Sequence, residues 1–177
     1  PYYRVDAAAA TLTAVHPYNR FIGVDAEWVA GDLTWRTELG YTADVPATRP
    51  DVTMARVDAL EWAGAVEAFP GGGDTRVTLQ LVARSLRGGQ PLLELKHYAG
   101  VNGEVEASLA QGRWKAALRF AAGLNVRDTY LGPRLSFVGW EPHEIYVAAH
   151  VFGGEARTRG GFHRDHDLIV LGVRTRF

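Results

Sequence analysis

A short polar run near the end of the chain holds the residues most able to do acid–base or metal chemistry. Residues 163–167 read HRDHD, which combines two imidazoles with two carboxylates. Such groups bind divalent metals and transfer protons at neutral pH, so an enzyme such as a protease is one hypothesis. The flanking Gly160 and Gly161, and the lack of a second ligand pair that the sequence can place, favour a solvated loop. We therefore predict no metal site here.

The rest of the chain offers no recognisable catalytic motif. It contains no GxSxG, HExxH or P-loop pattern, and His97 and His143 are isolated. Paired carboxylates of the glycosidase kind are conceivable among the many acidic residues, but such pairs also arise without chemistry. We predict that the protein is not an enzyme, with no catalytic residues and no cofactor.

Composition excludes several classes of protein. The 177 residues carry a net charge of −1, which argues against a nucleic-acid partner because nucleic-acid binders show a basic excess. The absence of cysteine excludes a disulfide scaffold and a thiolate metal site. No apolar run approaches the roughly 18 residues that a transmembrane helix needs. No signal peptide is visible, and the chain begins at Pro1 rather than Met, so we expect a mature form or a fragment of something longer.

Apolar and polar residues alternate with a period of two along most of the chain. In segment 75–85, Val77 and Leu79 fall on one face, whereas Arg76 and Gln80 fall on the other. Successive side chains of a β-strand point to opposite faces, so this alternation predicts about ten strands. They are expected at residues 2–15, 20–30, 33–43, 59–69, 75–85, 101–111, 113–124, 130–139, 144–152 and 166–177.

Alternation alone fits both a soluble β-sandwich or lipocalin-like barrel and a membrane barrel, so the connections must separate the two. Short connections are expected at 30–32, 70–74, 111–113 and 141–143, and longer polar ones at 44–57, 86–100, 125–129 and 153–167. Short turns at one end and long loops at the other are typical of outer-membrane barrels. Strands of about 10 to 12 residues also have the length that a tilted strand needs to cross a bilayer.

Aromatic residues are sorted between the two ends of the expected strands. Tyrosines lie toward the long loops, and four of the tryptophans lie near short turns, while Trp62 lies deeper. Amphipathic rings favour the headgroup region of a bilayer, which makes two aromatic girdles typical of a membrane barrel. The membrane-interface residues that we predict are Trp28, Trp35, Trp114, Trp140 and Phe177.

The charged face of the strands carries both signs. In a membrane barrel this face lines the lumen, where it either tunes the selectivity of a channel or forms a salt-bridged plug. A complete barrel of about ten strands favours the plug, whereas part of a larger barrel favours the channel. The lumen-lining set is Asp25, Glu27, Arg36, Glu38, Arg76, Arg84, Glu104, Glu106, Lys115, Arg119, Arg134, Arg174 and Arg176, with Glu61 and Glu67 on the same face.

The final strand ends in an alternating pattern that closes on an aromatic residue. Ile169, Leu171 and Val173 share a face with Phe177, and Arg174 falls on the opposite face. This ending is similar to the C-terminal signature by which outer-membrane barrels are recognised for assembly. Thr175 departs from that signature, because an aromatic residue is commoner at its position.

Two longer stretches carry a family resemblance. Segment 21–46, FIGVDAEWVAGDLTWRTELGYTADVP, resembles the repeated hairpin of a group of proteobacterial outer-membrane barrels that lies near the alginate-export and general porin families. The tail from residue 132 is similar to the closing strands of that group. Members are usually much longer, so the resemblance implies the C-terminal portion of a larger barrel. It implies no catalytic residues.

We therefore predict an all-β fold, an antiparallel up-and-down transmembrane β-barrel of about ten strands, in one domain over residues 1–177. The expected function is a passive channel or transport component of the outer membrane of a Gram-negative bacterium. An outer-membrane enzyme with a site at the extracellular rim, and a structural barrel that anchors a partner, are the alternatives. The expected partners are the lipid bilayer, lipopolysaccharide and the outer-membrane assembly machinery, with a homo-oligomer or partner subunits compatible with the sequence.

Overall fold

A computed structural model of the chain describes residues 2–6 and 10–175. The protein is all-β, with a single short α-helix and one 3₁₀ turn among the described residues. No described helix is long and apolar enough to cross a membrane. The strands are β1 (Tyr2–Asp6), β2 (Thr11–Val15), β3 (Arg20–Ala30), β4 (Leu33–Thr48), β5 (Met54–Ala68), β6 (Thr75–Arg87), β7 (His97–Leu109), β8 (Trp114–Gly123), β9 (Asp128–Trp140), β10 (His143–Gly154) and β11 (Leu168–Thr175), with η1 at Pro70–Gly73 and α1 at Arg159–Phe162.

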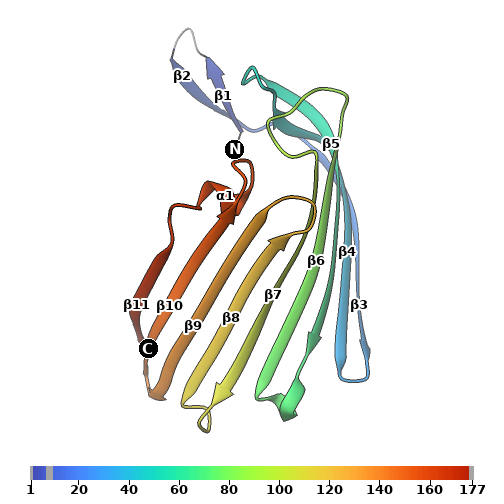
Figure 1. The fold of residues 1–177 in the computed structure, drawn as a ribbon. Coiled ribbons are helices and arrows are strands. Elements are labelled where there is room, and N and C mark those ends of the chain that lie inside the picture. Colours follow the sequence, from blue (N-terminus) through green and yellow to red (C-terminus); the bar gives the residue numbers. More distant parts are fainter. Residues whose placement is uncertain (1, 7–9, 176–177) are drawn as a thin grey trace.

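Nine of the strands form one antiparallel sheet in which every strand lies beside its sequence neighbour. The order is β11-β10-β9-β8-β7-β6-β5-β4-β3, so the expected up-and-down topology is confirmed for this sheet. Two-residue turns such as 31–32, where Gly31 has a φ of 61°, leave no length for a crossover. Figure 1 shows the sheet curving from β3 round to β11, with the short connections at one end and the longer ones at the other.

The first expected strand is wrong. Residues 2–15 do not form one strand, because β1 and β2 pair with each other in a separate two-stranded sheet. The interface between them runs from Tyr2 opposite Val15 to Asp6 opposite Thr11. In Figure 1 this hairpin lies at the end of the molecule that carries the longer connections.

The expected loop over residues 44–57 is also wrong. These residues were predicted as a longer polar connection, but β4 continues to Thr48 and β5 begins at Met54, after a register shift between Thr42 and Val45. A bulge of this kind lets paired strands continue past an irregular stretch. The remaining turn at 49–53 is closed by Thr53, whose hydroxyl and N–H both donate to Asp51. These hydrogen bonds lower the pKa of the Asp51 carboxyl below its ordinary value.

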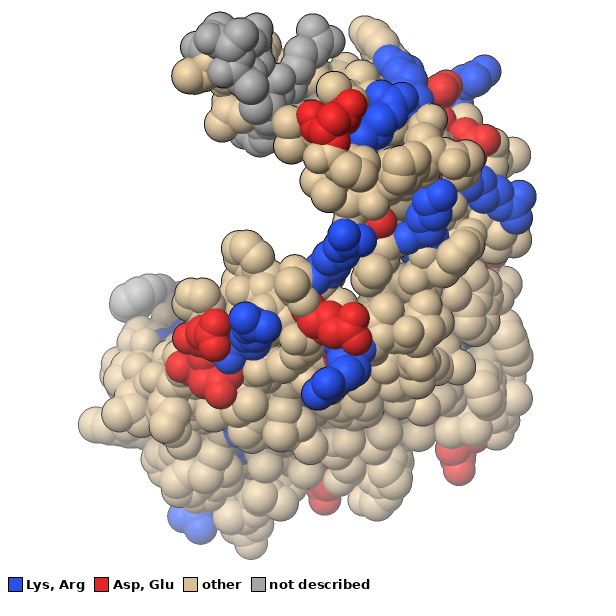
Figure 2. All heavy atoms as spheres, turned by 45° about the horizontal axis from the view of Figure 1, so that its top comes forward, with Lys and Arg blue, Asp and Glu red and all other residues tan. Residues whose placement is uncertain are grey.

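The sheet is not closed. Strand β3 pairs only with β4, and β11 pairs only with β10, so the two edges of the nine-stranded sheet have no partner strand among residues 2–6 and 10–175. The described residues therefore do not close the predicted barrel. Figure 2 shows the consequence, a hollowed molecule that is open along one side.

Large apolar side chains lie mostly on the surface rather than in a core. Ile22 is 71% exposed and Leu171 is 81% exposed, and no large side chain is fully buried within the described part of the chain. A chain of this length ordinarily buries a substantial apolar core. Here the apolar residues instead share one face of the sheet, which leaves that face without a covering layer.

The one buried apolar cluster lies where the 88–96 connection folds back over β4, β5 and β6. Leu92 packs there against a set of nearly inaccessible residues, and Leu93 N–H donates to the carbonyl of Thr48 at 2.8 Å. Glu94 accepts from the backbone N–H of Thr48. The other members of the cluster are Ala47, Ala55, Val57, Ala59 and Leu86.

We expect Leu92→Ala to destabilise this end of the sheet by about 2–3 kcal/mol, because a buried leucine loses both its transfer free energy and its packing. Leu92 is 7% exposed, whereas the adjacent Leu93 is 38% exposed, so Leu93→Ala is the matched control with a smaller loss. The measurement is limited proteolysis of the 88–96 connection combined with urea unfolding of the detergent-refolded chain. Equal losses for the two variants would contradict the assigned packing.

Candidate functional site: the charged face of the sheet

The charged residues predicted to line a lumen lie on one face of the nine-stranded sheet. The strand registers place Glu27 opposite Arg36 and Glu104 opposite Arg119, and the same alternation runs through every strand. This face carries Asp25, Glu27, Arg36, Glu38, Glu61, Glu67, Arg76, Arg84, Glu104, Glu106, Lys115, Arg119, Arg134 and Arg174. Arg176 lies outside the described residues.

The charged face is the hollowed one. A hollow of about 1570 Å³ is lined by residues that include Asp25, Glu38, Glu61 and Arg84. A second hollow of about 530 Å³ is lined in part by Arg36, Glu104 and Arg119. The apolar face, which carries residues such as Ile22 and Leu171, is the opposite one. Figure 2 shows the hollow from the end that carries the longer connections.

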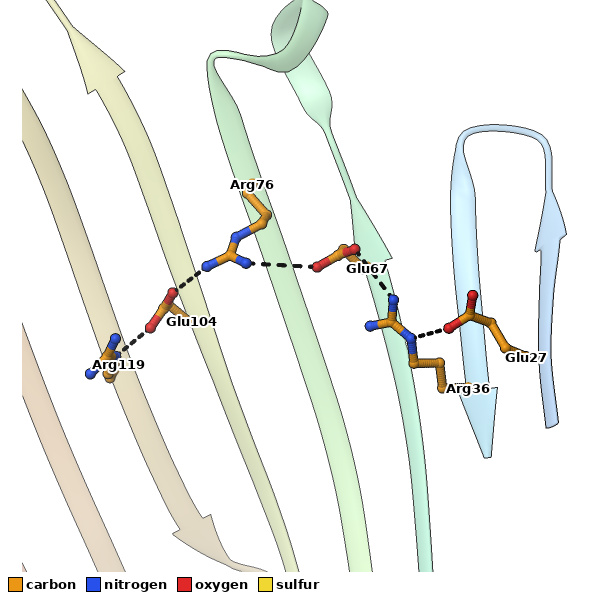
Figure 3. Close-up of polar contacts among 6 residues, drawn as sticks. All are labelled: Glu27, Arg36, Glu67, Arg76, Glu104 and Arg119. Carbon is orange, nitrogen blue, oxygen red and sulfur yellow. Dashed lines mark hydrogen bonds and ion pairs between the residues drawn. The ribbon is translucent and has the colours of Figure 1, made fainter. Parts of the chain in front are cut away.

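A ladder of alternating charges runs across six strands of this face, from β3 to β8 (Figure 3). Arg76 lies at its centre, 2.7 Å from Glu104 and 4.0 Å from Glu67 through its two terminal nitrogens. Glu104 accepts from Arg76 and Arg119 together, and Glu67 lies 3.8 Å from Arg36. The ladder consists of Glu27, Arg36, Glu67, Arg76, Glu104 and Arg119.

Long side chains allow the ladder to join residues that are not directly opposite each other. Arg76 is directly opposite Glu106 in the register, yet it forms its ion pairs with Glu104 on one side and Glu67 on the other. Diagonal neighbours on one face of a sheet are within reach of long side chains. One arginine thus bridges two carboxylates on different strands, which links strands β5, β6 and β7 through side chains as well as backbone.

A second network continues the same face across β9, β10 and β11. Glu144 accepts from Arg134 at 2.7 Å and lies 3.6 Å from Arg174, directly opposite it. The Arg134 guanidinium also lies over the ring of Tyr146, 3.8 Å from its centroid, and donates to the Ser136 hydroxyl. A cation over an aromatic face is a favourable contact that holds the arginine in place.

Two facing carboxylates outside the ladder lie next to each other on this face, without a cationic partner in the described part of the chain. Asp25 and Glu38 are directly opposite each other on β3 and β4, and neither forms an ion pair within the described residues. Both line the larger hollow. Like charges at directly opposite positions repel each other, so this part of the wall is a local concentration of negative charge. Cations are attracted to such a wall, and anions are repelled.

Aromatic residues also occupy the charged face, a feature that we did not predict from the alternation. The Tyr130 hydroxyl and His150 Nδ1 lie 2.9 Å apart on neighbouring strands, and both line the larger hollow. A Cβ added at Gly132 would approach the Tyr130 hydroxyl to 2.3 Å, so only glycine admits this ring position. Tyr130 and His150 occupy charged-face positions in the period-two alternation of β9 and β10, and this sequence signal could have placed them together.

The 163–167 run is positioned by packing and backbone contacts. The His163 ring contacts the rings of Phe152 and His166, and Asp167 accepts from the backbone N–H of Phe152 at 2.8 Å. No three His, Asp or Glu residues come together to hold a metal ion in the part of the chain that the structure describes. His97 and His143 form hydrogen bonds with Ser85 and Thr175 respectively.

The tryptophans predicted for the membrane interface cluster beside the short turns. Trp28 and Trp35 are directly opposite each other across the 31–32 turn and stack with their centroids 6.3 Å apart. Trp114 contacts Phe137, and Trp140 contacts the ring of His143. Phe177 lies outside the described residues.

The deeper Trp62 donates its indole N–H to the Thr37 hydroxyl on the neighbouring strand, at 3.1 Å. It lies on the apolar face, where such a bond satisfies its one polar group.

Comparison with known proteins identifies no relative. No protein-family model, no curated protein and no solved structure matches the chain. The resemblance to the alginate-export and porin-like group therefore stays a prediction.

We expect Glu104→Gln to destabilise the folded sheet by about 1–2 kcal/mol, because it leaves Arg76 and Arg119 without their shared carboxylate. Glu106→Gln is the matched control, since Glu106 lies on the same strand and face and forms no ion pair among the described residues. Its effect should be within about 0.5 kcal/mol. The measurement is urea unfolding of both variants refolded in detergent. A larger loss for Glu106→Gln would show that the ladder does not stabilise the sheet.

Proposed function

We propose that the protein is part of an integral outer-membrane β-barrel that acts as a passive channel or transport component. The observation that carries this proposal is the opposite character of the two faces of one curved sheet. Apolar side chains cover the convex side without any layer over them, and charged side chains line the hollow. Lipid outside and water inside is the arrangement in which both faces are satisfied.

The apolar face supports membrane insertion through the magnitude of its burial. Val24, Leu79, Leu118, Leu131 and Val147 are all exposed, each on a different strand. Fully burying one such side chain is worth about 1.5–3 kcal/mol, so covering these partly exposed residues together contributes a free energy comparable with the whole stability of an ordinary domain, about 5–15 kcal/mol. Exposed apolar patches of this extent mark an interaction surface. A bilayer surrounds a curved apolar face and covers the exposed side chains of all its strands at once.

The charged face supports a water-filled interior rather than a catalytic one. Most of its charges are neutralised in ion pairs, and of the carboxylates that are unpaired among the described residues, Asp25 and Glu38 face the larger hollow. Fixed charges on a pore wall tune ion selectivity. We therefore propose a channel wall that favours cations near β3 and β4.

Leu118→Arg should abolish or strongly reduce membrane insertion, because an arginine on the lipid face near the middle of a strand costs about 2–4 kcal/mol. The matched control is Ala117→Arg, at the next position of β8 and therefore on the charged face. The measurement is flotation of the refolded chain with liposomes. Loss of flotation for Ala117→Arg with none for Leu118→Arg would reverse the assignment of the two faces. If both variants instead stayed dissolved equally well in water without lipid, a soluble protein would be favoured.

The double variant Asp25→Asn with Glu38→Gln should lower cation selectivity, because it removes two negative charges from the wall of the hollow. The measurement is the reversal potential of the native, membrane-extracted protein in planar bilayers at about 0.1 M salt, where the Debye length is about 10 Å. Asp32→Asn, in the turn between the same strands, is the control with unchanged selectivity. A closed barrel without conductance would reject the channel and favour a structural anchor.

A further inference from the structure

The two unpaired edges of the nine-stranded sheet impose a requirement on its surroundings. Every residue of β3 is exposed, and the exposed Ile169 and Leu171 lie on the opposite edge strand, β11. In a bilayer each unpaired backbone N–H or C=O costs several kcal/mol, so open edges do not persist in the hydrocarbon region. Neither strand carries a proline that would blunt its edge. Both edges must therefore be paired when the sheet is in the membrane.

Strand direction restricts what can pair them. Every neighbouring pair in the sheet is antiparallel, and nine strands make eight such pairs. An even number of reversals leaves β3 and β11 running in the same direction. Direct pairing of β3 with β11 would therefore be parallel, unlike every other pair in the sheet. An antiparallel closure needs an odd number of strands between them.

We infer that the sheet is closed in the membrane by an odd number of further amphipathic antiparallel strands that belong to the same polypeptide and lie outside residues 1–177. Every strand of the sheet lies beside its sequence neighbour, so the missing neighbour of β3 is expected to come from the same chain. This neighbour must run toward the end of the sheet that carries the long connections, because it pairs antiparallel with β3. The inference rests on the proposed membrane location.

A second copy of this chain does not supply the missing strands. If two copies insert in the same orientation, β11 of one copy meets β3 of the other, and these strands run in the same direction. Pairing β3 with β3 of the second copy would be antiparallel, but it requires one copy to be inverted in the membrane. Outer-membrane barrels share a common orientation, with short turns on one side and long loops on the other.

The β1–β2 hairpin does not supply them either. Each of its strands has five residues, which span about 17 Å at 3.3–3.4 Å per residue, whereas β3 has eleven. The two strands already pair with each other over their whole length. Two strands are also an even number, which would leave the final seam parallel. The hairpin instead lies within a connection at the end of the sheet where the other long connections lie.

The test is site-directed cross-linking of the native protein in its own outer membrane, with a short benzophenone–maleimide attached to single cysteines. The chain has no cysteine of its own, which makes each attachment site unique within it. Val24→Cys probes the β3 edge and Leu171→Cys probes the β11 edge. Val101→Cys in the middle of the sheet is the control, because its opposite residues are Leu81 on β6 and Ala122 on β8.

We expect the control to link only to peptides of β6 and β8. Val24→Cys and Leu171→Cys should each link to one strand of the sheet and to one peptide outside residues 1–177 of the same polypeptide. Four results would overturn the inference: a β3–β11 link, a link to residues 10–15, a link between isotopically distinguished copies, or links to lipid alone. Extraction of the protein by alkaline carbonate would instead reject the membrane location, so the two failures are distinguishable.

Discussion

Backbone pairing between sequence neighbours sets a single register across nine strands, and the character of both faces depends on that register. Side chains alternate with a period of two, so a slip of one residue in any pairing would move its charged set to the apolar face. Two local exceptions occur. One is the shift between Thr42 and Val45, where the strands leave the apolar band and enter the buried cluster around Leu92, and the other is the shift between His143 and Ile145, beside the 141–142 turn. The register is thus continuous through the apolar band, and it shifts toward the ends of the paired segments.

Within the described residues, no layer covers the apolar face of the sheet. Half of the six members of the buried cluster are alanines, and the cluster lies at one end of the molecule. Cross-strand hydrogen bonding and the charge ladder hold the strands together, but neither compensates for the exposed leucines and valines in water. Among residues 2–6 and 10–175, the sheet therefore has an uncovered apolar face and two edges, β3 and β11, with no partner strand.

The charged face combines ion pairs between directly opposite residues with ion pairs between diagonal neighbours. Arg76 contacts carboxylates on both neighbouring strands, and Glu144 is shared by Arg134 and Arg174. Sharing reduces the entropy cost of each ion pair, since one ordered side chain serves two partners. The rings of Tyr130 and Tyr146 lie over glycines on the same face, where a side chain at Gly132 or Gly172 would collide with them. These tyrosines fill space between the charged groups, and Tyr146 also holds Arg134 in place through the contact of the guanidinium with its ring.

The all-β antiparallel class, most strand positions, the neighbour-to-neighbour order and the face of each described charged strand residue could be predicted from the amino-acid sequence. These properties follow from period-two alternation and short turns, which are local. Tertiary structure alone decided the division of residues 2–15 into two strands and the continuation of β4 past Pro46. It also decided the ion-pair partners, such as the choice of Glu104 over Glu106 by Arg76, and the open edges. Each of these depends on contacts between residues distant in the chain. Alternation leaves several pairings equivalent, and the choice among them is made by the length of the side chains, by packing against a connection and by the curvature of the sheet.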